Sequence, residues 1–221
     1  SEGMHIMEGF LPKEWALFWF AVFIPFFLLG FRKVKRIMKK DKNTKLLLGL
    51  CAAFVFVLSA LKIPSVTGST SHPTGVGLGA ILFGPLTMSV LGLIVLIFQA
   101  TLLAHGGLST IGANGFSMAV AGPFISYFVF IVLKKFNVNR SVTVFLAAFI
   151  GDLGTYMVTS IQLGLAFPDP TLGVMVSVTK FLSIFAFTQV PIAIAEGILT
   201  VMIYNFITEN FKKESEVLAY E

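Results

Sequence analysis

Long apolar runs separated by short polar segments constrain the fold of this 221-residue chain more than any other feature. A run of about 17–25 apolar residues crosses the hydrocarbon core of a bilayer as a helix. Charged residues make up 12% of the chain, about half the share of a soluble domain. We therefore predict an all-α integral membrane protein, a bundle of about seven transmembrane helices. The expected helices lie at 15–31, 46–63, 76–86, 87–104, 116–133, 142–161 and 181–207.

The positions of the basic residues predict the orientation of this bundle. Of 16 Lys and Arg, eight lie in 32–45, three in 134–141 and two in the tail after residue 210. Segments on the inner side of a membrane carry an excess of Lys and Arg. Seven crossings place all three basic segments inside, with the N-terminus outside and the C-terminus inside. Basic residues gathered in short clusters between apolar runs indicate membrane topology, so we expect no nucleic acid partner.

Three histidines, His5, His72 and His105, all fall in segments predicted to lie outside. Histidine is the commonest metal ligand among side chains. His72 lies in PSVTGSTSHPTGVGLG (64–79), where hydroxyl groups and backbone are able to orient a ligating imidazole. An ordinary outer loop with a solvated histidine would have the same composition. His105, in AHGGLSTIGANG, is open to a second interpretation, as a capping or packing residue at a helix end.

Two carboxylates, Asp152 and Glu196, fall within predicted membrane spans, accompanied by Gln99 and Gln189. A charged group at that depth is costly and is by default a candidate functional residue. Either the two acids carry out chemistry, or they make polar contacts that hold helices and partner subunits together. The sequence contains no G-x-x-x-x-G-K-[ST], H-E-x-x-H or C-x-x-C motif, and the single Cys51 excludes a disulfide framework.

Three separated motifs resemble one family of transport proteins. They are MHIMEGFLP (Met4–Pro12), IPSVTGSTSHPTGVGLGAILFGP (Ile63–Pro85) and LLAHGGLSTIGANGFSMAVAGP (Leu102–Pro123). In these segments the chain resembles the substrate-binding membrane subunit of energy-coupling-factor transporters for cobalt or nickel, the CbiM/NikM group. The resemblance runs from Met4 to about Asn210. The opening MHIMEG is more similar to the cobalt members, because nickel members commonly begin MHIPDG.

The resemblance implies a metal site built from nitrogen atoms. Met4 would supply a free amine, His5 its backbone amide nitrogen and its imidazole, and His72 a fourth nitrogen; the supporting candidates are His105, Ser71 and Ser69. Four nitrogens in a plane suit Ni(II), and a site that fixes this geometry accommodates Co(II). Met4 is not the first residue here, so its nitrogen is an amide as long as residues 1–3 remain attached. The metal site is therefore expected to be intact only when Met4 is the terminus.

The resemblance also implies a function and a set of partners. The chain would capture Co²⁺ or Ni²⁺ at an outward-facing site for an ATP-driven importer of the prokaryotic plasma membrane, without an organic cofactor and without catalysing a reaction. A transmembrane coupling subunit, two ATPase subunits and a small accessory membrane subunit would be its partners in the lipid bilayer. Two alternatives remain: an intramembrane enzyme using Asp152 and Glu196, and a secondary metal transporter that works alone.

We expect residues 1–221 to form a single transmembrane metal-binding domain. Residues 1–14 lack a charged segment followed by an apolar one, so no signal peptide is expected in this chain. Ser1-Glu2-Gly3 would be a remnant of processing or of an expression tag. Residues 211–221 would form a cytoplasmic tail.

Overall fold

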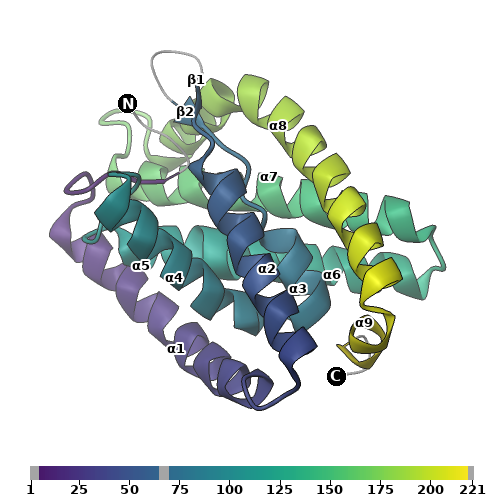
Figure 1. Ribbon diagram of the computed structural model, residues 1–221. Helices are drawn as coiled ribbons and strands as arrows, with labels where there is room; N and C mark the ends of the chain where they lie inside the picture. The colour runs from purple at the N-terminus through teal and green to yellow at the C-terminus, as the bar shows by residue number, and fades with distance from the viewer. Residues whose placement is uncertain (1–4, 65–69, 219–221) are drawn as a thin grey trace.

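The computed structural model describes residues 5–64 and 70–218, and most of them belong to helices joined by loops (Figure 1). The strands in this part of the chain are a two-residue antiparallel pair, β1 (Ile63–Pro64) with β2 (Thr70–Ser71). The helical elements are α1 (Lys13–Ile37), α2 (Lys42–Ala60), α3 (Val76–Phe83), α4 (Pro85–Leu102), α5 (Ile111–Asn114), the π-helical η2 (Gly115–Ala121), α6 (Gly122–Lys135), α7 (Arg140–Ala166), α8 (Val174–Asn210) and α9 (Lys212–Leu218).

The predicted all-α membrane fold is confirmed, with one difference in the count of spans. Six helices of the described chain are long and apolar enough to cross a bilayer: α1, α2, α4, the continuous stretch Ile111–Lys135, α7 and α8. The expected span at 76–86 is α3, which has only eight residues. Eight residues of helix are about 12 Å long, whereas the hydrocarbon core is about 30 Å thick. The predicted seven crossings are therefore reached only by counting α3 as a partial one.

Helix α3 is short because Gly84 and Pro85 end it and start α4. Gly84 has a φ of +85° and is both the C-cap of α3 and the N-cap of α4. Pro85 occupies the first turn of α4, where a missing backbone N–H leaves no hydrogen bond unmade. All eight residues of α3 are buried, so the helix lies inside the bundle, away from lipid.

The bundle has two chemically different ends, and the chain termini lie at opposite ends (Figure 1). At one end, which we call the histidine end, the N-terminal segment meets the β1–β2 pair and the loop after α4. At the other, which we call the basic end, Lys33, Lys134 and Lys135 lie around one cavity together with Ser215 of α9. This arrangement agrees with the predicted placement of 32–45, 134–141 and the tail on one side of the membrane.

Polar and apolar side chains are distributed as in a protein surrounded by lipid. Large apolar side chains cover the outside, among them Leu17, Phe128 and Phe187, the last 81% exposed. Polar side chains lie inside the bundle, where Asp152 and Gln189 are completely buried. A buried polar group needs hydrogen-bond partners, so the interior contains polar networks that fix neighbouring segments relative to one another. One of these networks supports the histidine end.

Candidate metal centre

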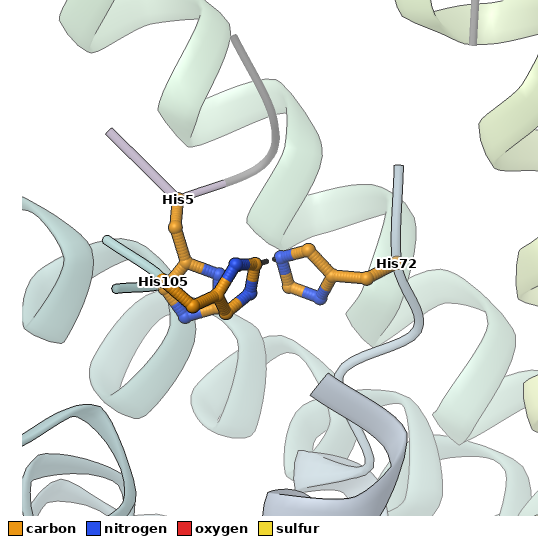
Figure 2. Close-up of side chains that lie close together, drawn as sticks. All are labelled: His5, His72 and His105. Carbon is orange, nitrogen blue, oxygen red and sulfur yellow. Dashed lines mark hydrogen bonds between the residues drawn. The ribbon is translucent and has the colours of Figure 1, made fainter. Parts of the chain in front are cut away.

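Three buried imidazoles meet at the histidine end of the bundle (Figure 2). His5 comes from the N-terminal segment, His72 from the segment between β2 and α3, and His105 from the loop after α4. Their side chains are 4%, 1% and 5% exposed. One ligand nitrogen of each ring lies within 4.8 Å of those of the other two. Histidines far apart in the sequence thus form one compact group of nitrogen ligands.

The hydrogen bonds of His72 determine which nitrogens carry protons. A backbone carbonyl only accepts, so Nδ1 of His72 donates to the Pro73 carbonyl, 2.8 Å away. Nε2 of His72 is then the acceptor, and Nδ1 of His5 donates to it over 2.6 Å. Nε2 of His5 and Nε2 of His105 have no hydrogen-bond partner among the described residues. A backbone carbonyl that orients an imidazole in this way is typical of metal-ligating histidines.

The 2.6 Å separation between His5 Nδ1 and His72 Nε2 is close to the spacing of two ligands on one ion. Two nitrogens that bind a metal at about 2 Å and at right angles are about 2.8 Å apart. The two nitrogens are therefore close enough to bind one ion together once both lone pairs point toward it. His5 would then carry its proton on Nε2, which has no hydrogen-bond partner among the described residues, so this pair binds an ion without net loss of a proton.

Burial keeps all three imidazoles neutral at physiological pH. Desolvation, followed by the charges of His105 and Lys62, lowers the pKa of His72 to about 3, and desolvation followed by the charge of Lys62 lowers the pKa of His105 to about 4. Desolvation also lowers the pKa of His5 well below its ordinary value, followed by the charges of His72 and His105. Neutral imidazoles have the lone pairs that a metal ion requires, and protons do not compete for them near neutral pH.

Hydrogen bonds from the loop after α4 hold the N-terminal segment beside this group. Asn114 accepts from the backbone N–H of Ile6 at 2.8 Å and donates to the carbonyl of Ile6 at 3.0 Å. Thr110 donates to the same carbonyl at 2.7 Å. Asn114 and Thr110 are 2% and 1% exposed, so these bonds are shielded from water. The residue that follows His5 is therefore fixed on both of its backbone polar groups.

A second contact in the same loop depends on the absence of a side chain at Gly107. A Cβ atom at this position would lie 2.5 Å from the Cα of Glu8, so only glycine allows the two segments to approach this closely. The carboxylate of Glu8 accepts from the backbone N–H of Ser109 at 3.1 Å, and Gly9 donates to the Ser109 hydroxyl. The hydrogen bonds from Ser109 lower the pKa of Glu8. The Gly-rich motif around His105 thus forms a cradle for the N-terminal segment.

Helix α8 holds the segment that carries His72. Gln189 donates to the His72 carbonyl at 3.3 Å, and its amide nitrogen is also 2.8 Å from Oδ2 of Asp152 on α7. Ser71 shares a hydrogen bond with Thr188 at 2.9 Å. Residues 71 and 72 are therefore fixed by neighbouring positions of α8.

Glu196, two helical turns further along α8, holds the residues that follow His72. Its carboxylate accepts from the backbone N–H of Thr74 and, at 3.1 Å, from the Thr74 hydroxyl. Glu196 and Thr74 are both almost fully buried. Of the two interpretations of the intramembrane acids, these contacts match the one in which Asp152 and Glu196 make polar contacts between segments.

The sequence-predicted site residues have different outcomes in the structure. His5, His72 and His105 come together, whereas Met4 and Ser69 lie outside the described residues. Ser71 is adjacent to the group but its hydroxyl bonds to Thr188. Sequence reasoning did not identify four supporting residues, namely Glu8, Thr74, Thr110 and Thr188. No sequence pattern marks these four residues. A signal was available only for Gln189 and Glu196, whose seven-residue spacing places both on one face of a helix and so predicts that they support the same neighbouring segment.

Comparisons with known proteins concern the chain as a whole and identify its family. The family profile described as "Cobalt uptake substrate-specific transmembrane region" matches residues 5–214. A cobalt transport protein CbiM of Clostridioides difficile (strain R20291) is 67% identical over 213 residues, which are 96% of this chain and 85% of that protein. A cobalt transport protein CbiM of Listeria seeligeri is 61% identical over 214 residues, 97% of this chain and 88% of that protein.

A solved structure also resembles the chain in fold. It is described as a truncated transition metal transporter, and it superposes with a TM-score of 0.79, covering 93% of this chain and 98% of its own, at 24% identity. The relatives are transport proteins, and the helices of this chain are those of a multi-pass membrane protein. The chain belongs to the CbiM family, the cobalt uptake substrate-specific transmembrane region.

Proposed function

We propose that this protein captures Co²⁺ at the histidine end of the bundle and that Ni²⁺ is the competing substrate. The observation that carries the proposal is the group of three buried imidazoles whose ligand nitrogens lie within 4.8 Å of one another. The names of the relatives support cobalt as the transported ion. The ion is bound and released without a covalent change, so the protein acts as a transport subunit and not as an enzyme.

In this proposal the ligands are His5, His72 and the N-terminal amine of a chain that begins at Met4. Nδ1 of His5 and Nε2 of His72 already lie at the spacing of two ligands on one ion. The backbone amide of His5 would complete a set of four nitrogens. His105 supports the set, with its ring centroid 4.2 Å from that of His5. Such a set favours Ni(II) intrinsically, so selection of cobalt has to come from the geometry that the surrounding loops impose.

The proposed energy source is a partner, because the sequence contains no P-loop motif. A transmembrane coupling subunit and two ATPase subunits would drive import, with a small accessory membrane subunit in addition. The competing proposal is a secondary transporter that works alone. Uptake of Co²⁺ by cells that express this chain without the ATPase subunits would favour the secondary transporter.

Calorimetric titration with Co²⁺ and Ni²⁺ tests the proposed binding directly. A chain beginning at Met4 is expected to bind one ion tightly. Because the terminal amine and the backbone amide of His5 have to lose protons in order to bind the ion, the measured enthalpy is expected to change with the ionisation enthalpy of the buffer. Absence of binding by both metals would contradict the proposal, and binding without proton release would contradict the proposed amine and amide ligands.

Replacement of Asn114 is expected to weaken metal binding without removing a ligand. Asn114→Ala deletes both of the hydrogen bonds from Asn114 to Ile6 and leaves the one from Thr110, so His5 is held less firmly, and a loss of about 10–100-fold in Co²⁺ affinity is expected. Asn114→Asp keeps the acceptor for the Ile6 N–H and should lose less. Asn210→Ala, at the basic end, is the matched control. Equal affinity in Asn114→Ala and Asn210→Ala would show that the cradle does not position His5.

Replacement of Glu196 distinguishes a positioning role from the enzyme alternative. Glu196→Ala removes the acceptor that holds Thr74, so a loss of about tenfold in Co²⁺ affinity is expected. Glu196→Gln retains an acceptor oxygen and should recover part of that affinity. Glu209→Ala, an exposed carboxylate on the same helix, is the control. Unchanged affinity in Glu196→Ala would contradict the positioning role and restore the interpretation that the acids carry out chemistry.

A further inference from the structure

A cavity of about 750 Å³ lies at the basic end of the bundle, opposite the histidine end. It is lined by residues of the end of α1, the turn between α3 and α4, helix α6, the C-terminal part of α8, and α9. Nothing in the proposed capture of a metal ion at the histidine end uses this space. Its volume falls within the range of about 300–1,000 Å³ that is typical of small-molecule sites.

The polar side chains of this cavity are all hydrogen-bond donors. The polar lining consists of three lysines, two tyrosines and one serine: Lys33, Lys134, Lys135, Tyr127, Tyr204 and Ser215. No carboxylate is present among the lining residues whose side chains the structure describes. The adjacent acid Glu214 is engaged elsewhere, because it accepts from the side chain of Asn43 at 3.0 Å. A lining of cations and hydroxyl donors is complementary to an anion rich in acceptor oxygens, such as a phosphate group.

Two of the lysine amines are positioned against the cavity wall. A Cβ atom on Gly84 would lie 2.6 Å from the Nζ of Lys33, which is too close for two such atoms. Because residue 84 is a glycine, the α3–α4 turn leaves room for this amine. The Nζ of Lys134 lies 5.8 Å from the centroid of the Phe130 ring, which is itself part of the lining. Both positive charges are therefore held at the cavity.

The remaining walls are apolar and extend to the lipid-facing surface. They include Ile81, Leu82 and Phe83 at the end of α3, which are buried, and Phe124 and Ile131 of α6, which are 38% and 44% exposed. An occupant of this space contacts donors at one part and hydrocarbon side chains at another. A free phosphate ion would leave the apolar walls uncovered, whereas a lipid would cover both surfaces.

We propose that this cavity binds an anionic phospholipid of the inner leaflet, with the phosphate near the three lysines and part of an acyl chain along the apolar wall. The basic end faces the inner side by the positive-inside rule. The inner leaflet is rich in anionic lipids, and basic pockets between transmembrane helices bind their headgroups.

Thermal unfolding of the purified full chain in neutral detergent tests the proposal. Phosphatidylglycerol is compared with phosphatidylcholine of the same acyl chains. Phosphatidylglycerol at about 100 times its dissociation constant is expected to raise the Tm by about 5 °C, and phosphatidylcholine by much less. The shift should fall by at least about half in Lys134→Gln/Lys135→Gln. It should be retained in Lys35→Gln/Lys39→Gln, a control that removes the same charge from the same end outside the cavity.

A second variant and a second measurement make the test independent of folding defects. Tyr127→Phe removes one donor without changing charge and should reduce the lipid-induced shift, and native mass spectrometry should detect one retained phosphatidylglycerol per chain in the wild type. Equal shifts in the cavity and control double variants would overturn the proposal. Stabilisation by phosphatidylcholine, or by soluble glycerophosphate alone, to the same extent would also overturn it, the latter by identifying a phosphate site without a lipid.

Discussion

Replacement of His72 by alanine is expected to lower the affinity for Co²⁺ by at least about a hundredfold, which corresponds to about 2.7 kcal/mol of binding free energy. Loss of residues that only support a ligand typically costs 10–100-fold, so loss of the ligand itself should cost at least that much. His72 Nε2 faces His5 Nδ1 at 2.6 Å, so the variant leaves His5 without the second imidazole of this pair. Calorimetric titration of the variant measures the loss.

The matched control for this prediction is His105→Ala, which removes an imidazole of the same group. The His105 ring lies with its centroid 4.2 Å from that of His5 and 5.2 Å from that of His72, and its Nε2 has no hydrogen-bond partner among the described residues. Its replacement is expected to lower the affinity about tenfold, as the loss of a supporting residue does. A smaller variant, His72→Gly, should regain Co²⁺ binding when free imidazole is added, which separates loss of a ligand from misfolding. A larger loss of Co²⁺ affinity in His105→Ala than in His72→Ala would mean that His105 is the ligand and that His72 is the supporting residue.

A chain that begins at Met4 is expected to bind Co²⁺ at least about a hundredfold more tightly than the chain that begins at Ser1. When Met4 is the first residue, its nitrogen is an amine, and this amine, the next amide nitrogen and the His5 imidazole chelate one ion in fused rings. With residues 1–3 attached, the same nitrogen is an amide flanked by a longer chain, and the amine lies three residues away. Titration of the two chains under identical conditions gives the ratio.

A chain that begins at Glu2 is the sharpest control, because its amine is displaced by two residues and His5 becomes its fourth residue. It is expected to bind as weakly as the chain that begins at Ser1, whereas a chain that begins at Gly3 would place His5 third and create a different four-nitrogen chelate from its own amine, two amides and the imidazole. Equal affinities in all three chains would mean that the terminal amine is not a ligand. The site would then consist of the three imidazoles alone, and His105 would take the place proposed for Met4.

Most of the fold could be predicted from the sequence, because lipid imposes strong conditions on composition. A helix surrounded by hydrocarbon needs an uninterrupted apolar run, and six such runs were found close to their observed positions. The region from Val76 to Leu102 was less predictable. Apolarity marks both a helix that faces lipid and a short one buried in protein, and α3 is the latter. Only the tertiary structure distinguishes the two.

The candidate site was predicted in part. His5 and His72 were identified as ligands of the metal site because both lie in segments predicted to be outside the membrane and in motifs shared with the resembled family. His105 was open to another interpretation, because a histidine at the end of a helix is often a capping or packing residue. Its meeting with the other two depends on how the loop after α4 folds back on the N-terminal segment, through contacts at Gly107 and Asn114. Hydrogen bonds of that kind leave no periodic pattern in a sequence. The supporting role of Glu196 was accessible, because its seven-residue spacing from Gln189 indicated a shared helix face.

The most direct test of the central claim is X-ray absorption at the cobalt edge, measured on the chain beginning at Met4 with one equivalent of Co²⁺. The account predicts a first shell of nitrogen atoms together with the outer-shell scattering of at least two imidazoles, from His5 and His72. Loss of one imidazole contribution is expected in His72→Ala. A first shell made of oxygen atoms, or a spectrum unchanged by His72→Ala, would contradict the proposed metal site.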